Sequence, residues 1–185
     1  MVASSVFVNE TIQVLPTPYS HSITPRLEYC TYLVETILGR LEKEHLAVQK
    51  TNQEFYLKNK DLTKNNDFKR RIKIEASLSC AVEALKTIKG RLESISQIGN
   101  IATTISPLIS IIRAINSNIY TNMPHPNHDL IELSTTLGSI VMDSGSLAEA
   151  KFDFKQTNLE STRILAEVNL IAESKIRTQY PNLNF

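Results

Sequence analysis

A long helical period runs through the middle of the chain, from Ile74 to Ile119. Small or apolar residues alternate at spacings of four and three: Ile74, Leu78, Ala81, Leu85, Ile88, Leu92, Ile95, Gly99 and Ala102. This spacing places all of them on one face of an α-helix. A single helix of this length cannot bury such a face alone, so the chain must supply an equally long partner.

The preceding segment provides that partner. We expect a first helix from about Pro25 to Leu62, with Thr24 as its N-cap and Pro25 at its first position. The two apolar faces then meet in an antiparallel hairpin. Its predicted seam consists of Leu27, Val34, Ile37, Leu41, Val48, Leu78, Leu85, Ile88, Leu92 and Ile95. Polar residues at Glu44, Thr51 and Lys58 interrupt the face, so we expect the pairing to weaken toward the turn.

The composition fits an all-α fold. The chain has 5 glycines and no tryptophan, and it lacks the Gly-rich turns of β-sandwiches and nucleotide-binding α/β enzymes. We predict a long antiparallel helical hairpin with shorter C-terminal helices. The expected parts are an extended or disordered arm (1–24), one helical domain (25–180) and a tail (181–185). The domain divides into the hairpin (about 25–120), a short helix (about 127–144) and a last helix (about 146–179), the last being the least firmly packed.

Two features interrupt the second long helix. Pro107 lacks the backbone N–H that a helix needs, so we expect a kink or break near Ser106. The segment from Ile95 to Ile112 holds 18 residues without a charge, which approaches the length of a membrane span. Seven of the 18 are polar, and the apolar period continues into them. A buried helix therefore fits better than a spanning one.

Cations gather where the two long helices join. Residues 58–73 hold seven of them against Asp61 and Asp67, a net charge of +5 in a chain whose total is +1. These cations are Lys58, Lys60, Lys64, Lys69, Arg70, Arg71 and Lys73. They form either a solvated loop or a contact for an anionic membrane or acidic partner. Few aromatic residues accompany them, which disfavours nucleic acid as a partner.

No catalytic or cofactor pattern stands out. His125 and His128 flank a short turn without the further ligands that a zinc site needs. Cys30 and Cys80 fall on the predicted apolar faces and are expected to be free thiols. We therefore expect a non-enzymatic protein without a metal or cofactor.

A string of helix positions carries a resemblance to a known family. It comprises Arg91-Leu92-Glu93, Gly99-Asn100, Ser106-Pro107, Ile109, Ile111, Ile112, Arg113, Met123-Pro124, Leu130, Glu132, Leu133 and Leu137. This string resembles the archaeal ESCRT-III family, the cell-division protein B group. The resemblance covers roughly residues 25–178 and is strongest at 88–145.

The resemblance implies a polymer-forming, membrane-remodelling subunit that acts in archaeal cell division or membrane scission. Its implied partners are further copies, paralogous ESCRT-III subunits and an anionic membrane surface. Its implied location is cytoplasmic, peripheral at the inner face of the cell membrane, at the division site. An AAA ATPase disassembles such polymers. Because only PNLNF follows Tyr180, we expect that contact to be indirect. The residues alone leave open a soluble helical adaptor or coiled-coil interaction protein without membrane activity.

Overall fold

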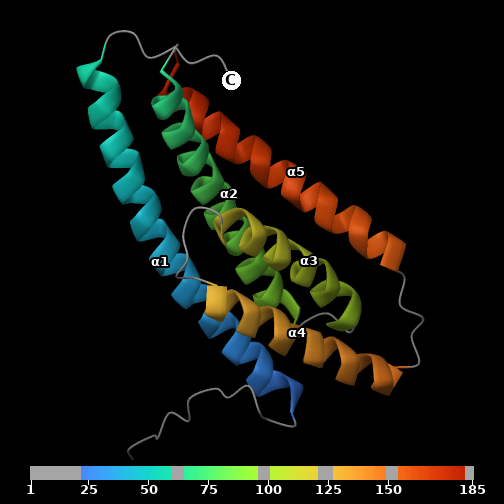
Figure 1. Cartoon of the computed structure of the whole chain (residues 1–185). Helices are drawn as coiled ribbons and strands as arrows, with labels where there is room; N and C mark the ends of the chain where they lie inside the picture. Colours follow the sequence, from blue (N-terminus) through green and yellow to red (C-terminus); the bar gives the residue numbers. More distant parts are fainter. Residues whose placement is uncertain (1–21, 60–64, 96–100, 121–126, 149–153, 182–185) are drawn as a thin grey trace, which may run out of the picture.

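The fold is all-α in the part of the chain that the computed structural model describes. That part comprises residues 22–59, 65–95, 101–120, 127–148 and 154–181. Its helices are α1 (Ile23–Lys58), α2 (Asn66–Ile95), α3 (Ile101–Tyr120), α4 (Asn127–Ala148) and α5 (Phe154–Gln179). The predicted fold class is confirmed: a long hairpin precedes shorter helices (Figure 1).

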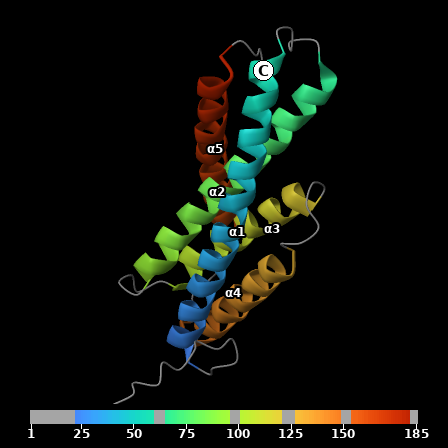
Figure 2. The same cartoon turned by 90° about the vertical axis from the view of Figure 1, so that its left-hand side faces the viewer.

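The α1–α2 hairpin forms the long axis of the molecule, and the other helices pack against it (Figure 1). Helix α4 packs on α1, and α3 lies between α4 and the α2–α5 pair. Helix α5 runs back along α2, so its C-terminal end reaches the hairpin tip (Figures 1 and 2). The residue after α5, Tyr180, therefore lies against the first turns of α2.

One main core joins all five helices. Eight of the predicted seam residues are buried in it: Val34, Ile37, Leu41, Leu78, Leu85, Ile88, Leu92 and Ile95. Leu27 and Val48 are partly buried against the same core. Helix α4 buries Leu130, Leu133, Leu137 and Ile140, with Val141 partly buried beside them.

The second long helix is shorter than predicted. Instead of one helix from Ile74 to Ile119, α2 ends at Ile95 and α3 begins at Ile101. The residues between them include Gly99 and Asn100, which favour turns over helix. The hairpin proper therefore comprises only α1 and α2, and α3 packs separately against α2, α4 and α5.

Of the predicted kink or break near Ser106, the break does not occur, since Pro107 lies inside α3. The kink stays a prediction. The Ser106 hydroxyl donates a hydrogen bond to the Ala102 carbonyl oxygen at 2.8 Å within the same turn. Pro107 is followed by Leu108, which is fully buried, as are Ile111 and Ile112. A proline inside a helix costs about 3 kcal/mol, and the burial of these side chains offsets that cost.

Several predicted helix ends move. Helix α1 begins at Ile23 with Ser22 as its N-cap, so Thr24 lies within the first turn. Helix α4 continues past Ser144 to Ala148, and α5 begins at Phe154 rather than near residue 146. Most of the predicted arm (residues 1–21) and of the tail (182–185) lies outside the described residues.

Helix α5 buries one face against the other helices. Ile164, Val168, Ala172 and Ile176 form it, at spacings of four, and Tyr180 extends it beyond the helix. Leu159 and Ile171 are exposed. The described helices include none that is long and apolar enough to cross a membrane.

Candidate functional site

The hairpin tip carries the predicted cluster of cations. Its described members are Lys58 at the end of α1 and Lys69, Arg70, Arg71 and Lys73 at the start of α2, and all are exposed. None of them forms a salt bridge within the described residues. Lys60 and Lys64 lie outside that part of the chain. We call the five described residues the basic tip.

Aromatic rings pack beneath the basic tip. The rings of Phe55 and Phe68 stack at 5.5 Å between centroids, and Tyr56 stacks on Phe68 at 6.1 Å. Tyr180 meets Tyr56 and Phe68 edge-on, at 5.3 and 5.9 Å. Ile72 and Ile176 complete a second core that we call the tip cluster: Phe55, Tyr56, Phe68, Ile72, Ile176 and Tyr180.

A cation–π contact joins the two clusters. The guanidinium carbon of Arg71 lies 5.4 Å from the centre of the Phe55 ring, within the range of an attractive interaction. Arg71 therefore serves the packing of the tip as well as its charge. Lys69, Arg70 and Lys73 have no such ring contact in the described residues.

A buried carboxylate anchors the tip cluster. Glu75 is fully buried, and its Oε2 accepts hydrogen bonds from Asn52 Nδ2 at 2.7 Å and from the Tyr180 hydroxyl at 2.9 Å. These donors come from α1 and from the residue directly after α5, so one side chain of α2 links three segments. Burial and the neighbouring Glu75 raise the pKa of Tyr180 well above its usual value, which keeps the hydroxyl a donor.

The prediction of a weakening seam therefore misses a second core. Helix α1 contributes no residue beyond Val48 to the main core. Asn52, Phe68 and Ile72 are nevertheless buried, and they lie between Val48 and the hairpin tip. Pattern reasoning overlooked Glu75 and Tyr180. A signal existed in α2, since Phe68, Ile72, Glu75, Ser79 and Val82 follow helical spacing and Glu75 is the one charge among them.

Polar contacts hold α4 against the N-terminal half of α1. Arg26 Nη1 lies 2.6 Å from Asp143 Oδ2, and Arg40 Nη1 lies 2.5 Å from Asp129 Oδ2. Between these two ion pairs, the hydroxyl of Tyr29 donates a hydrogen bond to Glu132 Oε1 at 2.5 Å.

Burial raises the pKa of the nearby Cys30 thiol to about 12, so Cys30 is an inert core residue.

Helix α5 is fastened to α2 in a similar way. Arg91 Nη1 lies 2.5 Å from Glu160 Oε1, and Lys175 Nζ lies 2.7 Å from Glu83 Oε1. Although burial acts in the opposite direction, Lys175 and Lys86 together lower the pKa of Glu83. The Cys80 thiol donates to Asn169 Oδ1 at 2.9 Å. Both cysteines are free thiols.

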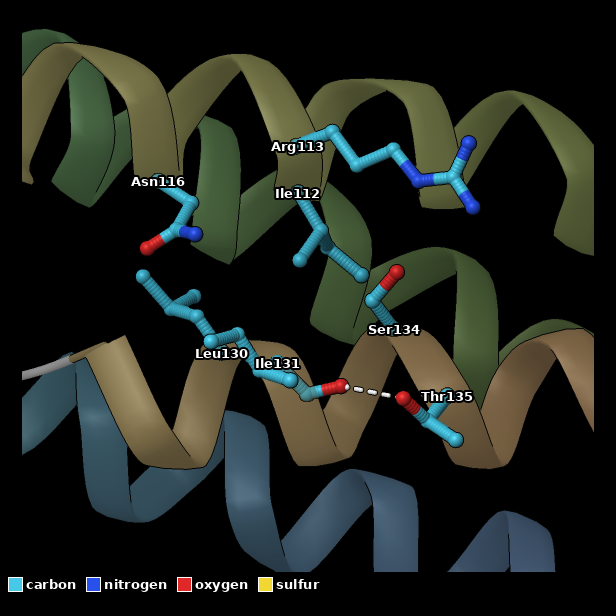
Figure 3. A pocket seen from close by; sticks show the side chains of 7 residues that line it. All are labelled: Ile112, Arg113, Asn116, Leu130, Ile131, Ser134 and Thr135. Atoms are coloured by element: carbon cyan, nitrogen blue, oxygen red, sulfur yellow. Dashed lines mark hydrogen bonds between the residues drawn. The ribbon is translucent and has the colours of Figure 1, made fainter.

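A shallow groove lies between α3 and α4 (Figure 3). Ile112 and Leu130 line it beside Asn116, and Arg113 extends away from Asn116 along α3. Its volume of about 200 Å³ is smaller than that of usual small-molecule sites. We therefore assign no ligand to it. His128 belongs to no group of three or more potential metal ligands in the described residues, while His125 lies outside them.

Comparison with known proteins finds a partial match with Cell division protein B1 of Sulfolobus acidocaldarius. The chains are 26% identical over 111 residues, which make up 60% of this chain and 52% of that protein. The chain thus spans about half the length of this relative. No family model matches the sequence, and no solved structure matches it. At the level of family, the match agrees with the resemblance to the cell-division protein B group.

Proposed function

We propose that the chain is a polymer-forming, membrane-remodelling subunit that resembles ESCRT-III and acts in archaeal cell division or membrane scission. It works with further copies and with paralogous subunits at the cytoplasmic face of the cell membrane, at the division site. The observation that carries the proposal is the partial match with Cell division protein B1 in a chain built around a long helical hairpin.

The basic tip supports the membrane part of the proposal. Its five cations are exposed and have no acidic partner within the described residues. Each basic group near an anionic bilayer contributes about 1 kcal/mol of attraction. The tip cluster holds these side chains on two packed helix ends rather than on free chain.

Exposed apolar pairs support self-assembly. Helices α4 and α5 each expose a pair of large apolar side chains eleven residues apart: Ile131 and Met142 on α4, and Leu159 and Leu170 on α5. Eleven residues make about three helical turns, so the members of each pair lie on the same side of their helix. Exposed apolar groups in rows of this kind are suited to contacts between subunits.

Co-sedimentation with vesicles tests the membrane contact. The test variant is Lys69/Arg70/Lys73→Gln, which leaves the Arg71–Phe55 contact in place. A matched control, Lys43/Lys50/Arg113→Gln, removes the same charge from exposed positions outside the tip. We expect the test variant to lose binding to anionic vesicles and the control to retain it. Wild-type binding should fall as salt is added. Equal binding of both variants would contradict the proposed contact.

Negative-stain images over a concentration series test assembly. We expect filaments to form above a threshold concentration and earlier in the presence of anionic vesicles. A single oligomeric species at every concentration, combined with no vesicle binding, would instead support the soluble adaptor.

A further inference from the structure

The most exposed large apolar side chain in the described residues lies at the basic tip. Leu57 is 83% exposed, next to last in α1 and directly before Lys58. The two residues before it, Phe55 and Tyr56, pack into the tip cluster. These contacts hold the last turn of α1 in place, so Leu57 projects outward from an ordered helix end.

The charges around Leu57 narrow the choice of partner. The described acidic residues nearest in sequence are Glu54 and Asp67, against the five cations of the basic tip. A partner must therefore be anionic and also accept an aliphatic side chain. The interface of an anionic bilayer offers both, because phosphates lie directly above the acyl chains. A nucleic acid or a solvated acidic surface offers mainly the charge.

We propose that Leu57 inserts into the boundary between headgroups and acyl chains of an anionic membrane, while the surrounding cations contact lipid phosphates. This inference rests on the proposed membrane contact of the basic tip and assigns an apolar component to it. Leu57 then determines how deeply the hairpin end enters the bilayer. Because the helix end is already packed, little additional ordering accompanies insertion.

Tryptophan fluorescence tests the insertion directly, because the chain contains no tryptophan. In Leu57→Trp, the sole indole reports on the tip. In the control Leu46→Trp, it reports on an exposed site of the same helix eleven residues earlier, where Leu46 is 61% exposed. The probes are vesicles of phosphatidylcholine alone, or mixed in equal parts with phosphatidylglycerol, with and without bromine on the acyl chains.

We expect the emission of Leu57→Trp to shift to the blue with anionic vesicles and to be quenched by brominated acyl chains. Leu46→Trp should show neither effect. Emission of Leu57→Trp that stays unchanged while the protein sediments with vesicles would overturn the insertion. A blue shift on concentrating the protein without lipid would also overturn it, since a second copy would then cover Leu57.

A second variant separates this inference from the proposed function. Leu57→Ser should weaken binding to anionic vesicles about tenfold, as expected for losing one buried aliphatic side chain, whereas Leu46→Ser should bind like the wild type. If Leu57→Ser binds like the wild type while Lys69/Arg70/Lys73→Gln does not bind, only the insertion fails. If the wild type does not bind anionic vesicles, both the proposed membrane contact and the proposed insertion of Leu57 are wrong.

Discussion

At the scale of single residues, Glu75 determines how the tip is built. A buried carboxylate is costly unless donors surround it, and here Asn52 and Tyr180 supply them. Its second oxygen, Oε1, has no hydrogen-bond partner among the residues that the structure describes. The two donors that it does have, both bonded to Oε2, are therefore important, and losing either leaves the buried carboxylate with a single donor.

The hydroxyl of Tyr180 is the simplest part of this arrangement to remove. Tyr180→Phe keeps the edge-on ring contacts but leaves Glu75 with one donor fewer. We expect the free energy of unfolding to fall by about 1–3 kcal/mol, measured by urea denaturation. Tyr32→Phe, at a half-exposed ring, is the control and should change stability by less than about 0.5 kcal/mol. Equal effects of the two substitutions would argue against the role of the hydroxyl.

His45 gives the fold a pH dependence. Partial burial lowers its pKa below the ordinary 6.5; Glu75 and Glu83 oppose the shift, and Lys175 and Lys86 reinforce it. The folded chain therefore favours the neutral imidazole. The contribution of His45 to the free energy of unfolding is therefore fully present above the imidazole pKa of the unfolded chain. It is lost as the pH falls below that pKa.

We accordingly expect the midpoint urea concentration of wild-type unfolding to decrease as the pH is lowered from about 7.5 to about 5.5. His45→Gln cannot take up the proton and should show a smaller fall over the same interval. Parallel profiles for the two proteins would assign the pH dependence to other groups.

At the scale of elements, the helices follow from the sequence better than their ends do. The apolar period that predicts α2 continues through Gly99 and Ala102 without a change of phase, so the pattern alone does not reveal the end at Ile95. Pro107 is the stronger local signal for a break, yet burial of the α3 side chains outweighs it. Tertiary packing therefore overrides local propensity at Pro107, whereas at the end of α2 the turn preference of Gly99 and Asn100 outweighs the apolar period.

Pro107 offers a test of this view. If α3 tolerates the proline rather than needing a bend, Pro107→Ala should leave the free energy of unfolding unchanged to within about 1 kcal/mol, because the helix gain offsets the lost ring packing. Leu108→Ala, at the fully buried neighbour, should lose about 2–5 kcal/mol. Thermal unfolding followed by circular dichroism measures both. A large loss in Pro107→Ala would mean that α3 requires the proline geometry.

At the scale of the whole molecule, two separate cores lie one after the other along the length of the hairpin. The main core joins all five helices, whereas the tip cluster draws on α1, α2 and the end of α5. The seam could be predicted because its residues repeat at helical spacing. The α2 part of the tip cluster follows the same spacing, but its contact with Tyr180 could not be predicted, because Tyr180 and Glu75 lie 105 residues apart and no repeat connects them.

The tip should therefore depend on a residue distant in sequence. In Tyr180→Ala, we expect amide hydrogen exchange to become faster in the last turns of α1 and the first turns of α2, with little change around Leu85 and Ile88 in the main core. Hydrogen-exchange mass spectrometry measures this difference. Leu170→Ala, at an exposed site of α5, is the control. Uniform acceleration along the whole hairpin would show that the two cores are not separate units.

The Cys80–Asn169 contact gives the native chain its own reporter of α5 movement. Burial raises the pKa of the Cys80 thiol, which slows its reaction with alkylating reagents while α5 lies on α2. Cys30 is fully buried and stays silent. The rate at which Cys80 is labelled therefore measures how often α5 separates from α2. This rate can be compared between dilute protein, filaments and vesicle-bound protein without an engineered label.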